Sequence, residues 1–470
     1  MFLRQITDSS LAQNAYLIGC QRSGEAIIID PERDLDRYFK VAEENDLEII
    51  AVAETHIHAD FLSGARELVE NHGATAYLSE EGGPDWQSEW AKGNSKVRFL
   101  KHGDVFKVGN IEFKALHTPG HTPEHMSFLL TDIGGGAVEP MALLSGDFIF
   151  VGDVGRPDLL ESAAGQAGAM EPSARTLYGS LRQTTGLPGY IQILPAHGAG
   201  SACGKALGAI PNSVMEYERK YNPSLREALA GDENQFIRSI LTGQPEPPLY
   251  FARMKRDNKT GPALLKNGLL PNPRRITADD LGTYVGKKEV SILDLRQSRE
   301  VYAAGHLRGA LFAPFAEGKL PAAAGSYVDE NARILLLVEE ASQVGEAVRQ
   351  LVRIGLDRVE AWLPAAEAIA DSPDVTSFKR ITPSELPADS TVLDVRGVDE
   401  YGSAHVRGAK NIAYTRLAAR FDEVPVGSPL HVHCAGGLRA AIAASFLASK
   451  GRGVVLVDGP FKDFPSGIIE

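Results

Sequence analysis

Cysteine and long apolar segments are both scarce in this sequence. Only three of its 470 residues are cysteine, and Cys20, Cys203 and Cys434 lie far apart in the chain. This spacing argues against a disulfide framework and is typical of a protein from a reducing compartment. No run approaches the roughly 18 apolar residues that a membrane helix needs, and the opening stretch lacks the basic and apolar regions of a secretory signal. We therefore expect a cytoplasmic protein that does not bind membranes.

Positively charged side chains are fewer than negatively charged ones. The chain has 48 Lys and Arg against 61 Asp and Glu, which gives a formal net charge of −13. This balance offers no general attraction for nucleic acid, so an anionic substrate must be held by local Arg or Lys side chains. Because domains usually contain about 100 to 200 residues, a chain of this length is expected to fold into several.

The N-terminal half alternates apolar runs with polar turns. The stretches 14–20 and 25–31 flank a short turn and predict a hairpin, and 47–56 predicts a buried strand. Residues 60–73 have the apolar spacing of a helix that ends at a glycine. The Pro-, Gly- and Lys-rich stretch 251–275 predicts a linker or a capping extension after a first domain at 1–250.

An internal repeat marks the C-terminal half. "LDLRQSREVYAAGHLRGA" at 293–310 matches "LDVRGVDEYGSAHVRGA" at 393–409. Each copy reads as a short strand that ends in Asp-x-Arg, a short helix, and a His-x-Arg-Gly-Ala turn. We therefore expect two small α/β domains of one kind, at 276–372 and 380–470.

Potential metal ligands follow four apolar strands of the first domain. "THIHADF" presents its ligands on alternate positions of one loop, and phenylalanine follows the aspartate. "HTPGHT", "LLSGD" and "LPAHG" come later in the chain. Together these stretches predict a metal site. The ligand candidates are His56, His58, Asp60, His117, His121, Asp147 and His197.

These stretches, together with "GDVGRPDLL" at 152–160 and "PAHGAGSACGK" at 195–205, resemble the metallo-β-lactamase superfamily and, within it, the persulfide dioxygenase branch. The resemblance implies an αββα sandwich and one Fe(II) per chain, held by His56, His121 and Asp147. The two-metal hydrolases of the superfamily have a histidine at the position of Phe61. A phenyl ring cannot coordinate a cation, so we expect no tight second site.

The chemistry of this ligand set favours the same interpretation. Two neutral imidazoles and one carboxylate on one face form the facial triad of non-heme iron oxygenases, which leaves room for a persulfide and dioxygen. A di-zinc hydrolase must instead generate a metal hydroxide. We expect His58, Asp60 and His197 to orient ligands or bound water through hydrogen bonds, or to be structural remnants.

Two further residues of this domain have two possible roles each. Arg156 is expected either to bind the carboxylate or phosphate of a thiol carrier, because guanidinium offers a bidentate fork, or to form a structural salt bridge. Cys203 is expected either to stand near the mouth of the metal site or to be a buried inert thiol.

A cysteine loop in the second repeat copy predicts sulfur chemistry. "LHVHCAGGLRAA" reads as a strand, a small-residue loop and a helix, so backbone N–H groups can surround the sulfur and favour its thiolate. The loop comprises Cys434, Ala435, Gly436, Gly437, Leu438 and Arg439.

This CxxGxR loop resembles that of the rhodanese family, with Asp394–Arg396 and His405–Gly408 as supporting signature. The six-residue length implies transfer of sulfane sulfur. The first copy has Glu339 or Glu340 where the cysteine should be, so we expect that domain to be inactive and to serve as a spacer or packing surface.

The combined hypothesis is an α/β multidomain enzyme that oxidises a low-molecular-weight persulfide with O2 to sulfite and thiol, and that makes or uses thiosulfate at Cys434. The thiol carrier is open between glutathione, coenzyme A and bacillithiol. We expect no nucleic acid or membrane partner and a homo-oligomer, a dimer or tetramer. One alternative is a glyoxalase II-like di-zinc thioester hydrolase with a sulfurtransferase tail. Another is a sulfur-relay module in which only Cys434 reacts.

Overall fold

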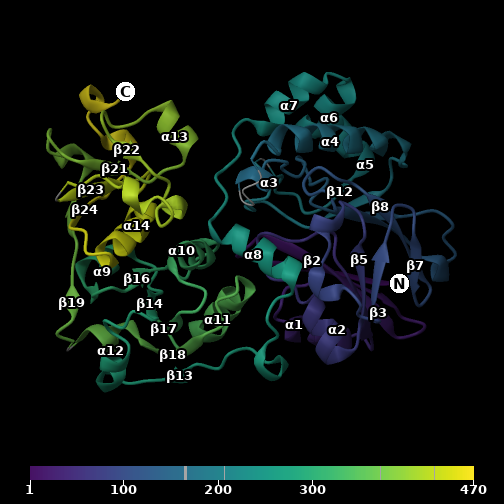
Figure 1. Cartoon of the computed structure of the whole chain (residues 1–470), viewed down its shortest axis with the longest axis horizontal. Coiled ribbons are helices and arrows are strands. Elements are labelled where there is room, and N and C mark those ends of the chain that lie inside the picture. Colours follow the sequence, from purple (N-terminus) through teal and green to yellow (C-terminus); the bar gives the residue numbers. More distant parts are fainter. Residues whose placement is uncertain (163–166, 206, 371, 428) are drawn as a thin grey trace. The chain divides into compact units, whose positions relative to one another are not determined.

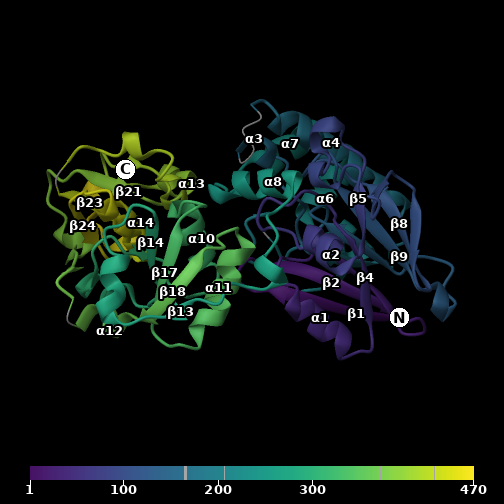
Figure 2. The same ribbon diagram turned by 60° about the horizontal axis from the view of Figure 1, so that its bottom comes forward.

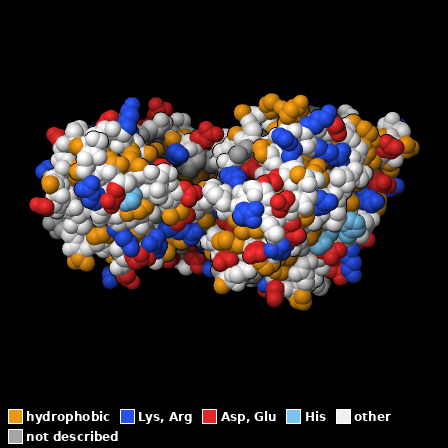
Figure 3. Space-filling view, turned by 90° about the horizontal axis from the view of Figure 1, so that it is seen from above, with side chains coloured by type: hydrophobic (Ala, Val, Ile, Leu, Met, Phe, Trp, Pro, Cys, Tyr) orange, Lys and Arg blue, Asp and Glu red, His pale blue; other side chains and the backbone are white. Residues whose placement is uncertain are grey.

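The structure is a computed structural model that describes residues 1–162, 167–205, 207–370, 372–427 and 429–470. The chain divides into two compact units. The first contains residues 1–247 and 251–268, and the second contains residues 248–250 and 269–470 (Figure 1). In the part of the chain that is described, no helix combines the length and apolarity that crossing a membrane requires. Side chains of both charge signs are interspersed over the face shown in Figure 3.

Two six-stranded sheets form the centre of the first unit, in the orders β1-β2-β3-β4-β5-β6 and β12-β11-β10-β9-β8-β7. The strands of the first sheet are β1 (Phe2–Asp8), β2 (Gln13–Cys20), β3 (Glu25–Ile29), β4 (Glu48–Ala53), β5 (Thr75–Ser79) and β6 (Val97–Leu100). Those of the second are β7 (Val105–Val108), β8 (Ile111–His117), β9 (Met126–Thr131), β10 (Ala142–Gly146), β11 (Gln192–Pro195) and β12 (Ser213–Val214).

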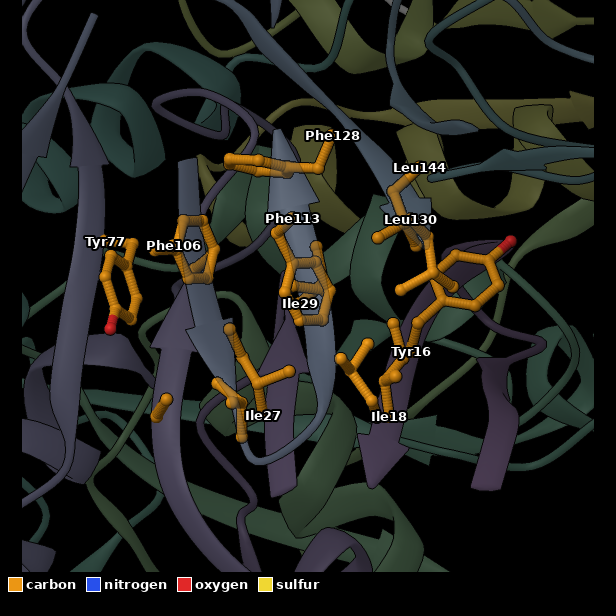
Figure 4. Close-up of a cluster of buried hydrophobic side chains, with 14 of the residues drawn as sticks. Tyr16, Ile18, Ile27, Ile29, Tyr77, Phe106, Phe113, Phe128, Leu130 and Leu144 are labelled. Carbon is orange, nitrogen blue, oxygen red and sulfur yellow. The ribbon is translucent and has the colours of Figure 1, made fainter. Parts of the chain in front are cut away.

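The core lies between these sheets. In β2, Tyr16 and Ile18 face the second sheet, and they pack with side chains such as Phe113 and Leu130 (Figure 4). Their neighbours Ala15 and Leu17 belong to the cluster on the opposite face, because successive side chains of a strand alternate. A strand that is buried on both faces accounts for the continuous apolar run in this stretch.

Helices cover the outer faces of both sheets, so the unit is the expected αββα sandwich. α1 and α2 contribute to the cluster on the first sheet, and α4, α6 and α7 to the cluster on the second. The helices of this unit are α1 (Asp36–Glu43), α2 (Ala65–His72), α3 (Leu159–Ser162), α4 (Met170–Gln183), α5 (Met215–Tyr221), α6 (Pro223–Ala230), α7 (Glu233–Leu241) and α8 (Tyr250–Thr260), the last from Phe251 onward.

Two local predictions can be compared with these elements. The hairpin is confirmed, because β2 and β3 pair in antiparallel register. The helix predicted over 60–73 begins only at Ala65. Residues 60–64 belong to the histidine loop, where the Ser63 hydroxyl accepts the Ala65 N–H at 2.9 Å. The helix ends as predicted at Gly73, whose φ of 76° is the left-handed conformation that favours glycine.

Two five-stranded parallel sheets form the second unit, in the orders β13-β18-β17-β14-β16 and β20-β24-β23-β21-β22 (Figures 1 and 2). The strands of the first are β13 (Arg274–Arg275), β14 (Val290–Asp294), β16 (Leu311–Phe312), β17 (Arg333–Val338) and β18 (Val359–Pro364). Those of the second are β20 (Lys379–Ile381), β21 (Val392–Asp394), β22 (Lys410–Asn411), β23 (Leu430–His433) and β24 (Val454–Val457). A short pair joins β15 (His306–Leu307) to β19 (Val375–Thr376).

Helices alternate with these strands, as the α/β prediction requires. Below, residues 269–370, which include the first of these sheets, are called the Cys-less lobe. Residues 379–470, which include the second sheet, are called the Cys434 lobe. The helices are α9 (Arg299–Ala304), α10 (Lys319–Tyr327), α11 (Gln343–Arg353), α12 (Ala365–Ala370), α13 (Val398–Ser403) and α14 (Leu438–Ser449).

The sequence repeat corresponds to a structural repeat. Arg296 donates from its NH2 group to Asp294 at 2.6 Å and to a backbone carbonyl at 2.8 Å. Arg396 makes the same two bonds, to Asp394 at 2.6 Å and to a carbonyl at 2.7 Å. The repeated Asp-x-Arg therefore fixes the turn after β14 in one lobe and after β21 in the other.

The two lobes contact each other within the second unit. The Phe312 N–H donates to the Ser445 hydroxyl of α14 at 3.0 Å. Tyr327 of α10 stacks on Phe446 with ring centroids 4.4 Å apart. These contacts give the Cys-less lobe the packing surface that was expected of it. The division into three domains stays a prediction, since both lobes belong to one compact unit.

Candidate metal centre and cysteine loop

Three loops bring the predicted ligands together. His56 follows β4, His121 follows β8 and Asp147 follows β10. All three residues are buried, and their ligand atoms lie within 4.8 Å of one another. His121 Nε2 is 3.4 Å from an Asp147 carboxylate oxygen. This convergence of two imidazoles and one carboxylate is the arrangement that the sequence predicted.

The polar atoms of this cluster fit a cation. Both Asp147 carboxylate oxygens are buried, and neither has a hydrogen-bond partner among the described residues. Burial raises the pKa of Asp147 to about 6 and lowers the pKa of His121 to about 3. A buried carboxylate without a partner is costly, whereas neutral imidazoles offer lone pairs. A cation among the three groups would satisfy all of them.

Hydrogen bonds at the far nitrogens orient the two imidazoles. His121 Nδ1 lies 3.0 Å from the Arg156 carbonyl, so that nitrogen carries the proton and Nε2 is left as the lone-pair donor. His56 Nδ1 lies 2.9 Å from the Thr55 hydroxyl, which in turn donates to Asp30 at 2.8 Å. Such partners fix the tautomer and the ring orientation of a metal ligand.

A second group of potential ligands adjoins the first. Asp60, His197 and Cys203 also have ligand atoms within 4.8 Å of one another. His197 Nε2 is 3.4 Å from Asp60 and 3.4 Å from Asp147, and it has no hydrogen-bond partner in the described part of the chain. Cys203 is buried, and burial together with the Asp147 charge raises the pKa of its thiol well above the usual value. Cys203 is thus a buried thiol, as one of its two predictions states, and its sulfur lies beside the metal ligands.

His58 has a different environment from His56. Its Nε2 lies 3.1 Å from Asp30 and 3.2 Å from Glu54. Burial lowers its pKa, but the two carboxylates outweigh burial and raise the pKa of His58 well above the ordinary value. His58 is therefore an imidazolium between two carboxylates, which supports the loop electrostatically. These three residues form a third group that could hold a metal.

Arg156 occupies the second of its two predicted roles. Its guanidinium is buried and donates to Asp158 at 2.8 and 2.6 Å and to the Ala202 carbonyl at 2.9 Å. Because these bonds engage all three guanidinium nitrogens, the side chain forms a structural salt bridge. Its backbone carbonyl makes the hydrogen bond to His121, and its positive charge contributes to the lowered pKa of that imidazole.

Phe61 is completely buried beside the site. Its ring centroid lies 4.4 Å from that of His58. Its backbone carbonyl accepts a 2.7 Å hydrogen bond from Asn258. The phenyl ring thus fills the space next to the charged imidazole with a group that cannot bind a cation.

Several supporting residues lie outside the motifs that predicted the site. His125 Nε2 accepts the Asp147 N–H at 3.0 Å, and its position four residues after His121 was a usable signal. Asn258 of α8 donates to the His58 carbonyl at 2.9 Å and accepts the Ser63 N–H at 2.9 Å. About 200 residues separate it from the loop, so no local pattern could reveal it.

Lys255 also lies in α8, and its ammonium sits 3.9 Å from the ring centroid of Trp86. Burial lowers the pKa of this lysine to about 8. Its positive charge acts on His121 and on Glu124, which accepts the Ile57 N–H between the two histidines of the loop. The stretch predicted as a linker or capping extension therefore contributes directly to the surroundings of the metal centre.

The cysteine loop joins β23 to α14. The Gly437 N–H donates to the Cys434 sulfur at 3.0 Å, and the sulfur is buried while Ala435 and Gly436 are exposed. Arg439 forms a bidentate pair with Glu400 at 2.6 and 2.8 Å, which lowers the pKa of that carboxyl. One backbone N–H of the loop thus donates to the sulfur, and a nest of several donors stays a prediction.

The corresponding loop of the Cys-less lobe lacks a cysteine, and two of its backbone N–H groups are already hydrogen-bonded. The N–H groups of Glu339 and Glu340 donate to the side-chain oxygen of Gln343, at 2.9 and 3.3 Å. The backbone donors that would surround a sulfur or an anion are therefore already engaged, and both carboxylates are exposed.

Comparisons with known proteins agree with this geometry. Residues 10–197 match the family profile "Metallo-beta-lactamase superfamily" and residues 380–466 match "Rhodanese-like domain". A crystal structure described as a metallo-beta-lactamase from Staphylococcus aureus subsp. aureus COL is 41% identical, with a TM-score of 0.67, over 77% of this chain and 98% of that one. The chain belongs to the metallo-β-lactamase superfamily and carries a rhodanese-like domain at its C-terminal end.

Curated relatives of two kinds match the N-terminal half of the chain. "Persulfide dioxygenase ETHE1, mitochondrial" of Bos taurus is 28% identical over 48% of this chain and 76% of its own length. A hydroxyacylglutathione hydrolase of Francisella philomiragia is 27% identical over 50% of this chain and 87% of its own length. The chain is a fusion of a domain related to the persulfide dioxygenases with a rhodanese-like domain.

Proposed function

We propose that the first unit is a persulfide dioxygenase and that Cys434 is the nucleophile of a coupled sulfurtransferase. The observation that carries the first part is the buried cluster of His56, His121 and Asp147, whose carboxylate oxygens have no partner among the described residues. It matches a one-ion facial triad. The relatedness to persulfide dioxygenases supports the same reaction.

An Fe(II) ion held by these three side chains would supply the electron transfer between sulfane sulfur and dioxygen. The chain itself orients the imidazoles through Thr55 and the Arg156 carbonyl. It also buries the cluster, which limits the access of bulk water. The overall reaction is RSSH + O2 + H2O giving RSH, sulfite and two protons, in which sulfur loses the four electrons that dioxygen gains.

The second reaction takes place at Cys434. A persulfide on its sulfur transfers the outer sulfur atom to sulfite, which forms thiosulfate and releases the Cys434 thiolate. The reverse step forms the persulfide from thiosulfate. The Gly437 N–H, which donates to the sulfur at 3.0 Å, stabilises the anionic form in either direction.

Oxygen uptake with glutathione persulfide tests the first reaction. We expect the iron-loaded wild type and Cys434→Ser to consume oxygen, and His121→Ala to lose at least about 100-fold of the rate because a ligand is gone. If His121→Ala kept its oxygen uptake while Cys434→Ser lost it, a sulfur relay that depends only on Cys434 would replace this proposal.

A di-zinc thioester hydrolase is the second candidate. The observation that favours it is the Asp60, His197 and Cys203 group beside the first cluster, together with the related hydroxyacylglutathione hydrolases. Elemental analysis of wild type and Cys203→Ser separates the two. We expect close to one iron per chain in both proteins. Two zinc ions per wild-type chain, one of them lost in Cys203→Ser, would favour the hydrolase.

We also propose a cytoplasmic homo-oligomer that binds neither nucleic acid nor membranes. The acidic net charge of −13 supports the absence of polyanionic partners. Light scattering at several protein concentrations would test the assembly, and a monomer throughout would contradict it.

A further inference from the structure

A carboxylate lies directly behind the cysteine loop. A Cβ atom added to Gly437 would collide with an Asp458 carboxylate oxygen and would lie 2.7 Å from Arg299 Nε. Gly437 is also the residue whose N–H donates to the Cys434 sulfur. Asp458 therefore touches the loop at the backbone unit that stabilises the sulfur. An unneutralised negative charge there would repel anionic substrates.

Two arginines neutralise this carboxylate. Arg380 of β20 belongs to the Cys434 lobe and donates to Asp458 at 3.0 Å. Arg299 is the first residue of α9 in the Cys-less lobe, and its Nε donates to the other Asp458 oxygen at 2.9 Å. The lobe that has lost its own cysteine thus reaches the sulfur loop of its neighbour with a cation.

The charges around the loop balance only if Arg299 is included. Glu300 accepts from Arg299 NH2 at 3.1 Å, and Glu400 pairs with Arg439. In these ion pairs the cations are Arg299, Arg380 and Arg439, and the carboxylates are Asp458, Glu300 and Glu400. Without Arg299 the group would carry one net negative charge. The Asp458 side chain is only 7% exposed, so solvent would screen that charge poorly.

We propose that Arg299 is a positioning residue of the sulfur-transfer site: it holds and neutralises Asp458 behind the Gly437 backbone, and this allows the Cys434 loop to bind dianionic sulfur donors and acceptors such as thiosulfate and sulfite. The inference rests on the proposed sulfurtransferase. It makes the Cys-less lobe a functional part of that site rather than a spacer, although Arg299 itself touches no reacting atom.

Steady-state sulfur transfer from thiosulfate to cyanide by the full chain tests this role. We expect Arg299→Ala to raise KM for thiosulfate by about five- to tenfold while kcat changes by less than about twofold, because a charge that assists binding of the anion has been removed. KM for methanethiosulfonate, which carries one charge instead of two, should rise less. Arg299→Lys should restore most of the thiosulfate KM.

Two matched variants separate charge from packing. Arg275→Ala removes an exposed arginine of the same lobe, one that pairs with Glu367 at 2.7 Å, and should leave KM unchanged. In an Asp458→Asn background the carboxylate behind Gly437 is gone, so adding Arg299→Ala should change KM by less than about twofold.

The measurements distinguish a failure of the sulfurtransferase proposal from a failure of the Arg299 inference. If the wild type transferred no sulfur, or transferred it as fast as Cys434→Ser, the sulfurtransferase proposal would fall and this inference with it. If the wild type were active but Arg299→Ala kept the wild-type KM for thiosulfate, only the inference would be wrong. It would also be wrong if both donors lost activity equally and Arg299→Lys rescued neither, since Arg299 would then be a clamp between the lobes.

Discussion

Single residues set the charge of the metal centre. Asp147 and Asp60 are buried, and burial raises the pKa of each to about 6. His121, by contrast, stays neutral at any pH well above 3. Below pH 6 a cation must therefore displace protons from the carboxyl groups, whereas the imidazole is ready to bind it throughout.

The stability of the metal-free chain should depend on pH accordingly. Both carboxyl groups have a folded pKa above the unfolded value of about 3.9. Their contribution to stability is present below pH 4 and is lost as the pH rises through 6. We expect the melting temperature of the metal-free chain to fall between about pH 4 and 7 by more than that of the iron-loaded chain, and by less in Asp147→Asn. An equal fall in all three would contradict the assignment.

Phe61 tests whether one residue limits the number of metal ions. In Phe61→His, an imidazole at this buried position restores the superfamily's ligand, so we expect binding of a second equivalent of zinc. We expect no gain in persulfide oxidation. The variant should also be less stable by about 1–3 kcal/mol, because a buried polar ring replaces a phenyl ring packed on His58. An unchanged metal stoichiometry would show that residue 61 does not control the second ion.

At the scale of elements, α8 fixes the histidine loop from outside. Asn258 makes three hydrogen bonds to the loop, with the His58 and Phe61 carbonyls and the Ser63 N–H. The helix thus does for the loop backbone what Thr55 and Arg156 do for the imidazoles.

Removing that amide should loosen the metal site. We expect Asn258→Ala to destabilise the first unit by about 2–3 kcal/mol, since three buried backbone groups lose their partner. It should also lower the iron content and oxygen uptake. Lys259→Ala, next along α8, removes only a partly exposed ion pair with Glu89 and is the control. Full iron content in Asn258→Ala would show that the loop holds its shape alone.

The turn before α14 requires a glycine at position 437. Gly437 has a φ of 97°, which favours glycine, and it has no space for a Cβ beside Asp458. We expect Gly437→Ala to abolish sulfur transfer while oxygen uptake persists. Gly436→Ala is the matched control, because a Cβ there would meet nothing within 4 Å. Equal activity of both variants would mean that the loop tolerates rearrangement.

Across the whole molecule, the sequence predicted what neighbouring residues determine. The Asp-x-Arg repeat, the cysteine loop and the ligand stretches each combine a strand end with a loop, and this local pattern predicted a metal site with seven candidate ligands. The choice of His56, His121 and Asp147 among them came from the family resemblance. The relation of Asn258 to His58, and of Arg299 to Asp458, depends on how distant elements pack. No spacing in a single sequence encodes such contacts, so the supporting roles of α8 and of the Cys-less lobe could not be predicted.

The two proposed activities form a sequence within one chain, since sulfite from the first is the sulfur acceptor of the second. Product analysis tests this coupling most directly. Iron-loaded wild type and Cys434→Ser are each given one persulfide and oxygen, and sulfite and thiosulfate are quantified. We expect thiosulfate as a product of the wild type, and sulfite without thiosulfate from Cys434→Ser at a similar rate of oxygen uptake. Equal thiosulfate from both proteins, or no oxidised sulfur from either, would contradict it.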